Sequence, residues 1–340
     1  MHNIINKIIW SIVIILILFF IGLGLYNKYK LKEYTSKFFY MDTYIYIKIY
    51  SNDSNKANKA LKKVERIYKE YHELSDRYNS YPNINNIYYI KNNNSKDEYI
   101  KLDKKLYDLI KYGLDYKEKT NGYVDIGAGN LIDVWKRYIE KKDGLPDSKE
   151  LKSAKEDYVE IVLKDNMIKN NHPNIDLGCI AKGYTTEIVG EYLKSVGINK
   201  FLINSGGNVL VGENVNKKNY TIGIEDPDVK YDIFDIVKGN NIAVVTSGGY
   251  ERFYEYNNKR YSHIINPYTL YPSNKMKSIT VISKSSKEAD IMSTYLFMLD
   301  VDEALDYVNK NDLEAIIYTN NNEIKYSKGA KKYEYKKIQK

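Results

Sequence analysis

The chain has 340 residues, which is enough for one large domain or two small ones with an ample core. Hydrophobic residues make up 43% and charged residues 28%, as in globular proteins, and the net charge of +8 is spread along the chain. Because no basic stripe is interleaved with aromatic residues, the sequence does not favour nucleic acid as a partner.

The N-terminal segment is almost purely apolar, and Ile8 to Tyr26 contains no charged residue. About 20 such residues span a bilayer, and the chain shows neither the shorter apolar region nor the small-residue cleavage site of a secretory signal peptide. We therefore predict an uncleaved signal anchor with one transmembrane helix over residues 1–27, followed by a polar spacer over residues 28–37. One lysine precedes the apolar segment and three follow it closely. Counted naively, the positive-inside rule therefore favours a domain that faces the cytoplasm, although so few charges decide little.

A single domain is predicted over residues 38–330, and it begins with a strand. Phe39 to Tyr50 places apolar side chains at every second position, as a half-buried strand does. Asp103 is placed to cap the second of two amphipathic helices. The segments before the centre of the chain are two helices (Asn55 to Tyr71, Asp103 to Lys119), a loop with a short helical piece (Ser75 to Asn94), a charged surface excursion (Lys136 to Lys155) and a hairpin (Val159 to Leu163 with Met167 to Lys169).

The stretch from Asp176 to Gly207 joins strands to a helix through glycine turns. Asn174 to Leu177 has the pattern of a short strand, and Ile180 to Val196 has helical spacing. A glycine turn before a helix lets backbone N–H groups approach an anion at the positive end of the helix dipole, and Lys182 adds a charge there. Phosphate is the first ligand that this pattern indicates, and an ordinary structural joint is the alternative.

The rest of the domain mixes strands and helices, which predicts an α+β fold. Residues 331–340 are basic and are predicted as a frayed tail. The predicted strands are Phe201 to Asn204, Val209 to Val211, Tyr220 to Glu225, Ile233 to Val237, Ala243 to Thr246, Arg252 to Tyr256, Arg260 to Ile265, Ser278 to Ile282, Glu314 to Tyr318 and Glu323 to Tyr326, and the predicted helices are Lys287 to Leu299 and Val301 to Asn309.

Three short segments carry side chains suited to chemistry. Asp290 and Thr294 lie four apart on a predicted helix, hence on one face, and offer the hard oxygen ligands that Mg²⁺ prefers; a plain polar helix face is the alternative. Thr246 to Arg252 ends a strand with hydroxyls, glycines and an Arg, so it suits a phosphate, a ribose or an ordinary hairpin turn. His263, at a strand end before Pro267, suits an acid, a base, a phosphate contact or a structural histidine.

Seven short motifs follow one another along the predicted domain. They are Met41-Asp-Thr, Gly-Tyr-Val-Asp-Ile at 122–126, Asp-Leu-Gly-Cys-Ile-Ala-Lys-Gly-Tyr at 176–184, Asn-Ser-Gly-Gly-Asn at 204–208, Thr-Ser-Gly-Gly-Tyr-Glu-Arg at 246–252, His-Ile-Ile-Asn-Pro at 263–267 and Ala-Asp-Ile-Met-Ser-Thr at 289–294. In this order they resemble the FAD:protein FMN transferases, the ApbE family, and they cover nearly everything after the apolar N-terminus.

The resemblance implies an α+β fold related to the T-fold. It also implies an enzyme that uses FAD and Mg²⁺, moves the FMN moiety onto a Thr or Ser hydroxyl of another protein and releases AMP, with its catalytic domain outside the cell membrane. By the same resemblance, Asp290, Thr294 and the backbone carbonyl of Cys179 hold the metal. His263 and Asp290 are the implied catalytic residues, and His263 carries a proton. The implied FAD site consists of Met41, Tyr123, Val124, Asp125, Asp176, Lys182 and Ile265.

Some positions depart from the usual pattern of this family. Cys179 stands where Gly, Ala or Thr is common, and Asn266 replaces an Asp. Neither change removes an implied metal ligand. The loop Ser75 to Asn94 matches poorly, so no flavin contact is assigned to it.

Two other functions stay open at this stage. Some members of the family hydrolyse FAD to FMN and AMP with water in place of the protein hydroxyl, and a non-catalytic, membrane-tethered flavin-binding protein is a further alternative. The implied acceptors are extracytoplasmic flavoproteins, such as Rnf- or Nqr-type electron-transfer subunits or a surface flavoprotein, that carry an Asp-x-x-[Ser/Thr]-Gly-Ala-Thr-like motif.

Overall fold

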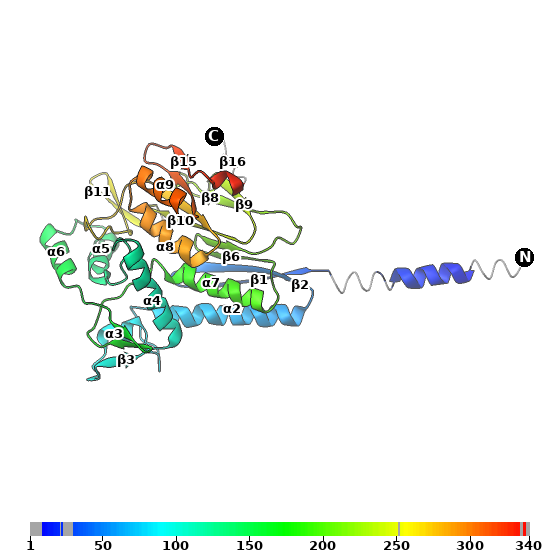
Figure 1. Cartoon of the computed structure of the whole chain (residues 1–340), viewed down its shortest axis with the longest axis horizontal. Helices are drawn as coiled ribbons and strands as arrows, with labels where there is room; N and C mark the ends of the chain where they lie inside the picture. The colour runs from blue at the N-terminus through cyan, green and yellow to red at the C-terminus, as the bar shows by residue number, and fades with distance from the viewer. Residues whose placement is uncertain (1–8, 21, 23–29, 251, 334–335, 338–340) are drawn as a thin grey trace, which may run out of the picture.

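An eight-stranded antiparallel sheet forms the centre of the molecule (Figure 1). The structure is a computed structural model that describes residues 9–20, 22, 30–250, 252–333 and 336–337. In the order of the sheet, its strands are β1 (Lys32–Tyr40), β2 (Thr43–Ser51), β6 (Phe201–Ser205), β7 (Asn208–Val211), β10 (Ile242–Gly248), β13 (Ser278–Ser283), β14 (Glu314–Tyr318) and β15 (Ile324–Tyr326).

Both faces of this sheet are buried, and strand β10 shows why. Side chains alternate between the faces of a strand, so Ala243 and Val245 belong to one buried cluster and Ile242 and Val244 to another. The first cluster lies under three helices: α2 (Ser54–Ser75), α7 (Ala181–Ser195) and α8 (Ser286–Phe297). The second lies under a three-stranded sheet of β8 (Tyr220–Glu225), β9 (Ile233–Gly239) and β16 (Lys336–Lys337).

The long helix α2 is anchored at its start and along one face. The Asp53 side chain accepts a hydrogen bond from the Lys56 N–H at 3.0 Å, which caps the helix. The predicted apolar stripe of this helix is buried, including Val64 and Tyr68. Asp103 caps α4 (Lys104–Lys119) in the same way, as predicted, by accepting from the Lys105 N–H at 2.8 Å.

A group of smaller elements completes the fold, and several of them lie beyond one end of the main sheet (Figure 1). Trp135 stacks on Tyr261, with 5.7 Å between the ring centres, and joins a helix to a small hairpin. The elements are α3 (Ile87–Asn92), α5 (Gly129–Lys141), α6 (Ser148–Glu156), α9 (Val301–Lys310), the sheet β3 (Tyr99–Lys101), β5 (Met167–Lys169) and β4 (Leu163–Lys164), the hairpin β11 (Phe253–Tyr256) with β12 (Lys259–Ser262), and the 3₁₀ turn Ala330–Tyr333.

The mixed α/β architecture is as predicted, but five local predictions were wrong. Residues 32–37 of the predicted spacer form most of β1. This is an edge strand, and its exposed charged residues resemble those of a polar linker. The predicted strand from Phe39 is broken by a turn at residues 41–42. The charged stretch 136–155 contains the last part of α5 and most of α6, whose apolar stripes are short. Residues 174–177 form no strand, and residues 336–337 of the predicted tail pair with β9.

The N-terminal prediction is only partly covered by the described residues. Residues 9–20 and 22 are helical. Across the residues that the structure describes, no helix is both long enough and apolar enough to cross a bilayer. Part of the predicted anchor, Ile8 to Tyr26, lies outside those residues, so the anchor stays a prediction.

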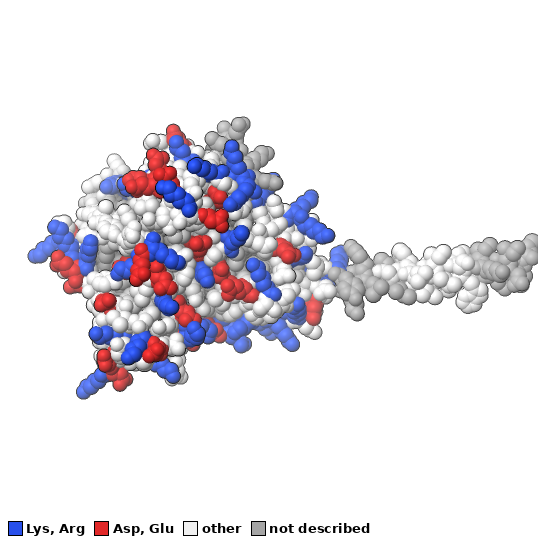
Figure 2. Space-filling view, viewed as in Figure 1, with Lys and Arg blue, Asp and Glu red and all other residues white. Residues whose placement is uncertain are grey.

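Charges of both signs cover the face drawn in Figure 2. Lys and Arg side chains alternate with Asp and Glu over most of this face, and neither sign gathers into one large patch. This face therefore lacks the continuous positive surface that a nucleic-acid backbone needs.

Candidate active site

One cavity of about 830 Å³ collects every residue that the sequence predicted for the site. Its wall is formed by the turn between β1 and β2, the loop after α2, the segment leading into α7, the end of β10 and one face of α8. The predicted residues in its lining are Met41, Tyr123, Val124, Asp125, Asp176, Cys179, Lys182, His263, Ile265, Asp290 and Thr294. Residues far apart in the sequence thus meet in one site, while their individual roles stay predictions.

Asp290 is held where α7 and α8 approach most closely. Its side chain is buried, and its Oδ2 accepts a hydrogen bond from the Gly183 N–H at 2.7 Å. A Cβ added at Gly183 would lie 2.3 Å from the Asp290 Cβ and 2.6 Å from the Ser286 carbonyl oxygen. Only glycine therefore allows this helix contact, which explains the Lys-Gly-Tyr sequence at the start of α7.

The electrostatics of Asp290 favour a cation beside it. Desolvation raises the pKa of the Asp290 carboxyl, while the charge of Lys182 and the Gly183 hydrogen bond oppose that rise. A buried carboxylate of this kind is stabilised by a nearby positive charge. Thr294 lies one helical turn further on the same helix, and its hydroxyl donates only a long hydrogen bond, 3.5 Å, to the Asp290 carbonyl.

The donor set fits a hydrated Mg²⁺ ion. Within the described part of the chain, no group of three or more His, Cys, Asp and Glu side chains is placed to hold a metal. The predicted site does not need such a group, because Mg²⁺ usually takes one or two protein oxygens and keeps water and phosphate oxygens. Asp290, Thr294 and the Cys179 carbonyl supply hard oxygen donors. Desolvation raises the pKa of the Cys179 thiol, so the thiol stays protonated and is a poor ligand at neutral pH.

The predicted backbone cradle for phosphate is mostly occupied by the protein itself. The Gly178 N–H donates to Asp176 Oδ1 at 2.8 Å, and the Ile180 and Ala181 N–H groups donate to the Leu177 carbonyl. The Gly183 N–H donates to Asp290 Oδ2. The prediction that this turn offers its amides to an anion was therefore wrong for these four groups. What the segment brings to the cavity is the charge of Lys182, in the first turn of α7.

Two adjacent turns bring strained or glycine backbone to the cavity edge. Met41 and Asp42 both have left-handed backbone, with φ of 53° and 57°, in the two-residue turn between β1 and β2. Such turns usually contain Asn or Gly, so this pair holds unfavourable backbone at a ligand-sized cavity. Beside it, Gly206 has φ of 57°, and its Cβ would lie 2.1 Å from Thr43 Oγ1. Glycine is required there by both the turn and the close approach.

His263 is arranged as a proton acceptor. Its Nδ1 lies 3.2 Å from the Arg252 carbonyl oxygen, which can only accept, so Nδ1 carries the hydrogen and Nε2 has a lone pair. Desolvation by the surrounding protein lowers the pKa of His263 to about 4, and the charges of Arg252 and Lys182 act in the same direction. The ring still reaches the water in the cavity, since the residue is exposed. The imidazole is therefore neutral at pH 7 and accessible.

The opposite wall carries Asp125 and Tyr123. The Asp125 carboxylate pairs with Lys117 at 2.8 Å and accepts from the Gly127 N–H at 2.8 Å. The ring of Tyr123 packs against Tyr268, with 4.8 Å between ring centres. These contacts hold the two side chains in place on the cavity wall.

The loop after α2, to which the sequence assigned no contacts, also lines the cavity. Arg77, Tyr78 and Tyr81 from this loop face the cavity, together with His72 from the last turn of α2. Arg77 forms an ion pair with the predicted site residue Asp176. Only one local signal pointed to this loop, namely a charged Asp-Arg pair directly after the amphipathic stripe of α2. The partners of Arg77 are far away in the sequence, so no local pattern reveals them.

A concave site of this size, with converging polar groups and shifted pKa values, is typical of an enzyme that binds a small molecule. The chain belongs to the ApbE family, whose family model matches residues 41–317. It is 29% identical to the FAD:protein FMN transferase of Vibrio cholerae over 233 residues, 66% of this chain and 68% of that protein. The FAD:protein FMN transferase of Klebsiella pneumoniae is 34% identical over 210 residues, 59% of this chain and 64% of that protein.

A solved structure supports the same assignment. The crystal structure of the ApbE protein of Thermotoga maritima superimposes with a TM-score of 0.79 at 25% identity, over 89% of this chain and 99% of that one. The predicted family and its mixed α/β fold are therefore confirmed. The chain spans about two thirds of the length of the curated relatives it matches and nearly the whole of the solved one.

Proposed function

We propose that this protein transfers the FMN moiety of FAD to a Thr or Ser hydroxyl of an acceptor protein and releases AMP. The observation that carries the proposal is the meeting of Asp290, Thr294, Lys182 and His263 in one cavity. That cavity lies within the range of roughly 300–1,000 Å³ typical of sites for cofactor-sized ligands. The relatives named above carry this activity in their names.

Each group of residues has a separate role in the proposed phosphoryl transfer. Asp290, Thr294 and the Cys179 carbonyl would hold Mg²⁺, which would supply positive charge to offset that of the diphosphate. Lys182 attracts the same diphosphate from the start of α7. The neutral Nε2 of His263 accepts the proton of the acceptor hydroxyl as its oxygen bonds to the FMN phosphorus. The bond from that phosphorus to the bridging oxygen breaks, and the electron pair leaves with AMP.

The test follows both products with the full-length protein. The protein is incubated with FAD, MgCl₂ and an acceptor that carries the Asp-x-x-[Ser/Thr]-Gly-Ala-Thr-like motif, and AMP release and acceptor mass are measured together. We expect one FMN per acceptor and equal AMP, both lost in Asp290→Asn. Free FMN with an unmodified acceptor identifies an FAD hydrolase, and FAD binding without turnover identifies a flavin-binding protein. Either result would replace the transferase proposal.

We further propose that the apolar N-terminus anchors the domain to the outer side of the cell membrane, where extracytoplasmic flavoproteins are the acceptors. The uncharged segment Ile8 to Tyr26 supports this, because about 20 apolar residues span a bilayer. Protease added to intact cells should digest the domain if it lies outside. Protection in intact cells combined with digestion after lysis would place the domain on the inner side.

A further inference from the structure

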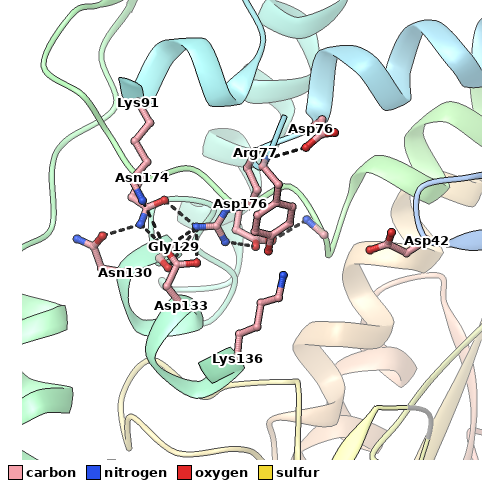
Figure 3. Close-up of polar contacts among 12 residues, drawn as sticks. Asp42, Asp76, Arg77, Lys91, Gly129, Asn130, Asp133, Lys136, Asn174 and Asp176 are labelled. Carbon is pink, nitrogen blue, oxygen red and sulfur yellow. Dashed lines mark hydrogen bonds and ion pairs between the residues drawn. The ribbon is translucent and has the colours of Figure 1, made fainter. Parts of the chain in front are cut away.

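A buried arginine in the cavity wall ties three separate segments together (Figure 3). Arg77 follows the end of α2, and only 8% of its side chain is exposed. Its Nη1 donates to Asp176 Oδ2 at 2.5 Å, while its Nη2 donates to Asn174 Oδ1 at 2.7 Å and pairs with Asp133 at 2.9 Å. The same nitrogen reaches the Gly129 carbonyl oxygen at 3.4 Å.

These contacts hold the segment that leads into α7. The two oxygens of Asp176 are divided between Arg77 on Oδ2 and the Gly178 N–H on Oδ1. The Asp176 backbone N–H donates to the Ile126 carbonyl at 2.8 Å. Residue 179 follows directly, and its carbonyl is the proposed metal ligand. The orientation of the Asp176 carboxylate therefore sets the shape of the turn that ends at this carbonyl.

Arg77 also balances charge at the cavity wall. The cluster contains two cations, Arg77 and Lys91, and two carboxylates, Asp133 and Asp176, with Lys91 3.4 Å from Asp133. Asp176 is 16% exposed, on the side of the cavity. Paired with a guanidinium, it repels an anionic ligand less than an unpaired carboxylate in a partly dry site would.

We propose that Arg77 is a positioning residue for the bound dinucleotide diphosphate: through Asp176 it fixes the turn that presents the Cys179 carbonyl and Lys182. This inference rests on the proposed FMN transfer. A lysine at this position keeps the charge but lacks the forked donors that reach Asp176 and Asn174 at once. The proposal therefore concerns the geometry of the guanidinium as well as its charge.

The test measures FAD binding by quenching of flavin fluorescence, FMN transfer and the thermal midpoint for the full-length protein and its variants. We expect Arg77→Lys to weaken FAD binding by about 10- to 100-fold, because a displaced turn misplaces the ligand. The double variant with Arg77→Lys and Asp176→Asn should bind FAD no more weakly than Asp176→Asn alone, since both changes act through one contact. Asp133→Asn should leave FAD affinity within about twofold, because the link to Asp176 remains.

The matched control is Arg137→Lys. Arg137 lies on α5 and forms an ion pair with Glu150, but 56% of its side chain is exposed, so FAD affinity should not change. Two results overturn the role: additive losses in Arg77→Lys with Asp176→Asn, or a loss in Asp133→Asn as large as in Arg77→Lys. If the unaltered protein binds FAD and transfers FMN, and Arg77→Lys binds FAD equally tightly, only the inference about Arg77 is refuted. An unaltered protein that binds no FAD overturns the proposed function as well.

Discussion

Replacing Gly183 with Ala tests whether the close crossing of α7 and α8 sets the position of Asp290. The new methyl group would meet the Asp290 Cβ at 2.3 Å and the Ser286 carbonyl oxygen at 2.6 Å. Neither atom lies at the end of a flexible side chain, so the helices must separate by about 1 Å to restore ordinary contact. That movement also stretches the 2.7 Å hydrogen bond from the Gly183 N–H to Asp290.

Gly190, on the same helix, provides a matched control. Its added Cβ would lie 2.6 Å from Leu210 Cδ2, the far end of a side chain that can turn away. In both variants, alanine gains about 1 kcal/mol of helix propensity over glycine. In Gly183→Ala, overpacking costs about 1–3 kcal/mol, and weakening a hydrogen bond to a charged group costs about 1.5–3 kcal/mol. We expect a net loss of about 2–4 kcal/mol for Gly183→Ala and a change within about 1 kcal/mol for Gly190→Ala.

Denaturant unfolding measures the stability change, and FMN transfer at saturating Mg²⁺ measures the effect on the site. A shift of about 1 Å in Asp290 should lower transfer by about 100-fold, whereas Gly190→Ala should stay close to the parent. Equal stability and activity in the two variants would refute the claim that this helix crossing is rigid. Full activity in a destabilised Gly183→Ala would refute the claim that it positions Asp290.

Three further outcomes follow from buried and partly buried polar groups. Tyr68→Phe should lower stability by about 1 kcal/mol in denaturant unfolding, because the hydroxyl that bonds Thr186 at 2.9 Å and Ser205 at 2.6 Å is lost; no change would mean that water fills the gap. Native Cys179 should react with iodoacetamide far more slowly at pH 8 than in urea, because the raised pKa keeps it a thiol, and Cys179→Ala should keep transfer activity if only the carbonyl binds metal. The pKa of His263 is about 4 in the folded protein, against an ordinary 6.5. Between these two pH values the unfolded chain binds more protons than the folded one, so the free energy of unfolding should fall as pH drops from 6.5 towards 4. NMR titration of the ring, with His263→Gln as control, measures this pKa, and a midpoint near 6.5 would contradict the prediction.

Regular alternation and helical spacing predicted most of the fold. Tyr220 to Glu225 was predicted with its observed bounds, because alternate side chains are buried and exposed along its whole length. The strand at residues 32–40 was missed because an edge strand with exposed lysines looks like a polar linker. α6 was missed because it buries only Leu151 among its charged residues.

The site divides in the same way. Asp290 and Thr294 were predicted as neighbours because helical spacing is local. The partner of Asp290 on α7, Gly183, and the partner of Asp176 after α2, Arg77, lie 107 and 99 residues away in the sequence. Such pairs depend on how whole segments pack, so a single sequence gives no direct sign of them. The amides of the glycine turn were misjudged for the same reason, since their acceptors became visible only in the folded chain.

Strand β1 also separates the N-terminal segment of the chain from the cavity. Lys32 starts this nine-residue strand, and its last residue, Tyr40, directly precedes Met41 at the cavity. At about 3.4 Å per residue, the strand separates the two by about 30 Å. Whatever surface holds the N-terminus, an acceptor hydroxyl must therefore reach the cavity from well above that surface. If a membrane anchors the N-terminus as proposed, a modified residue that lies flush with that membrane could not meet the cavity while the domain stands upright on it.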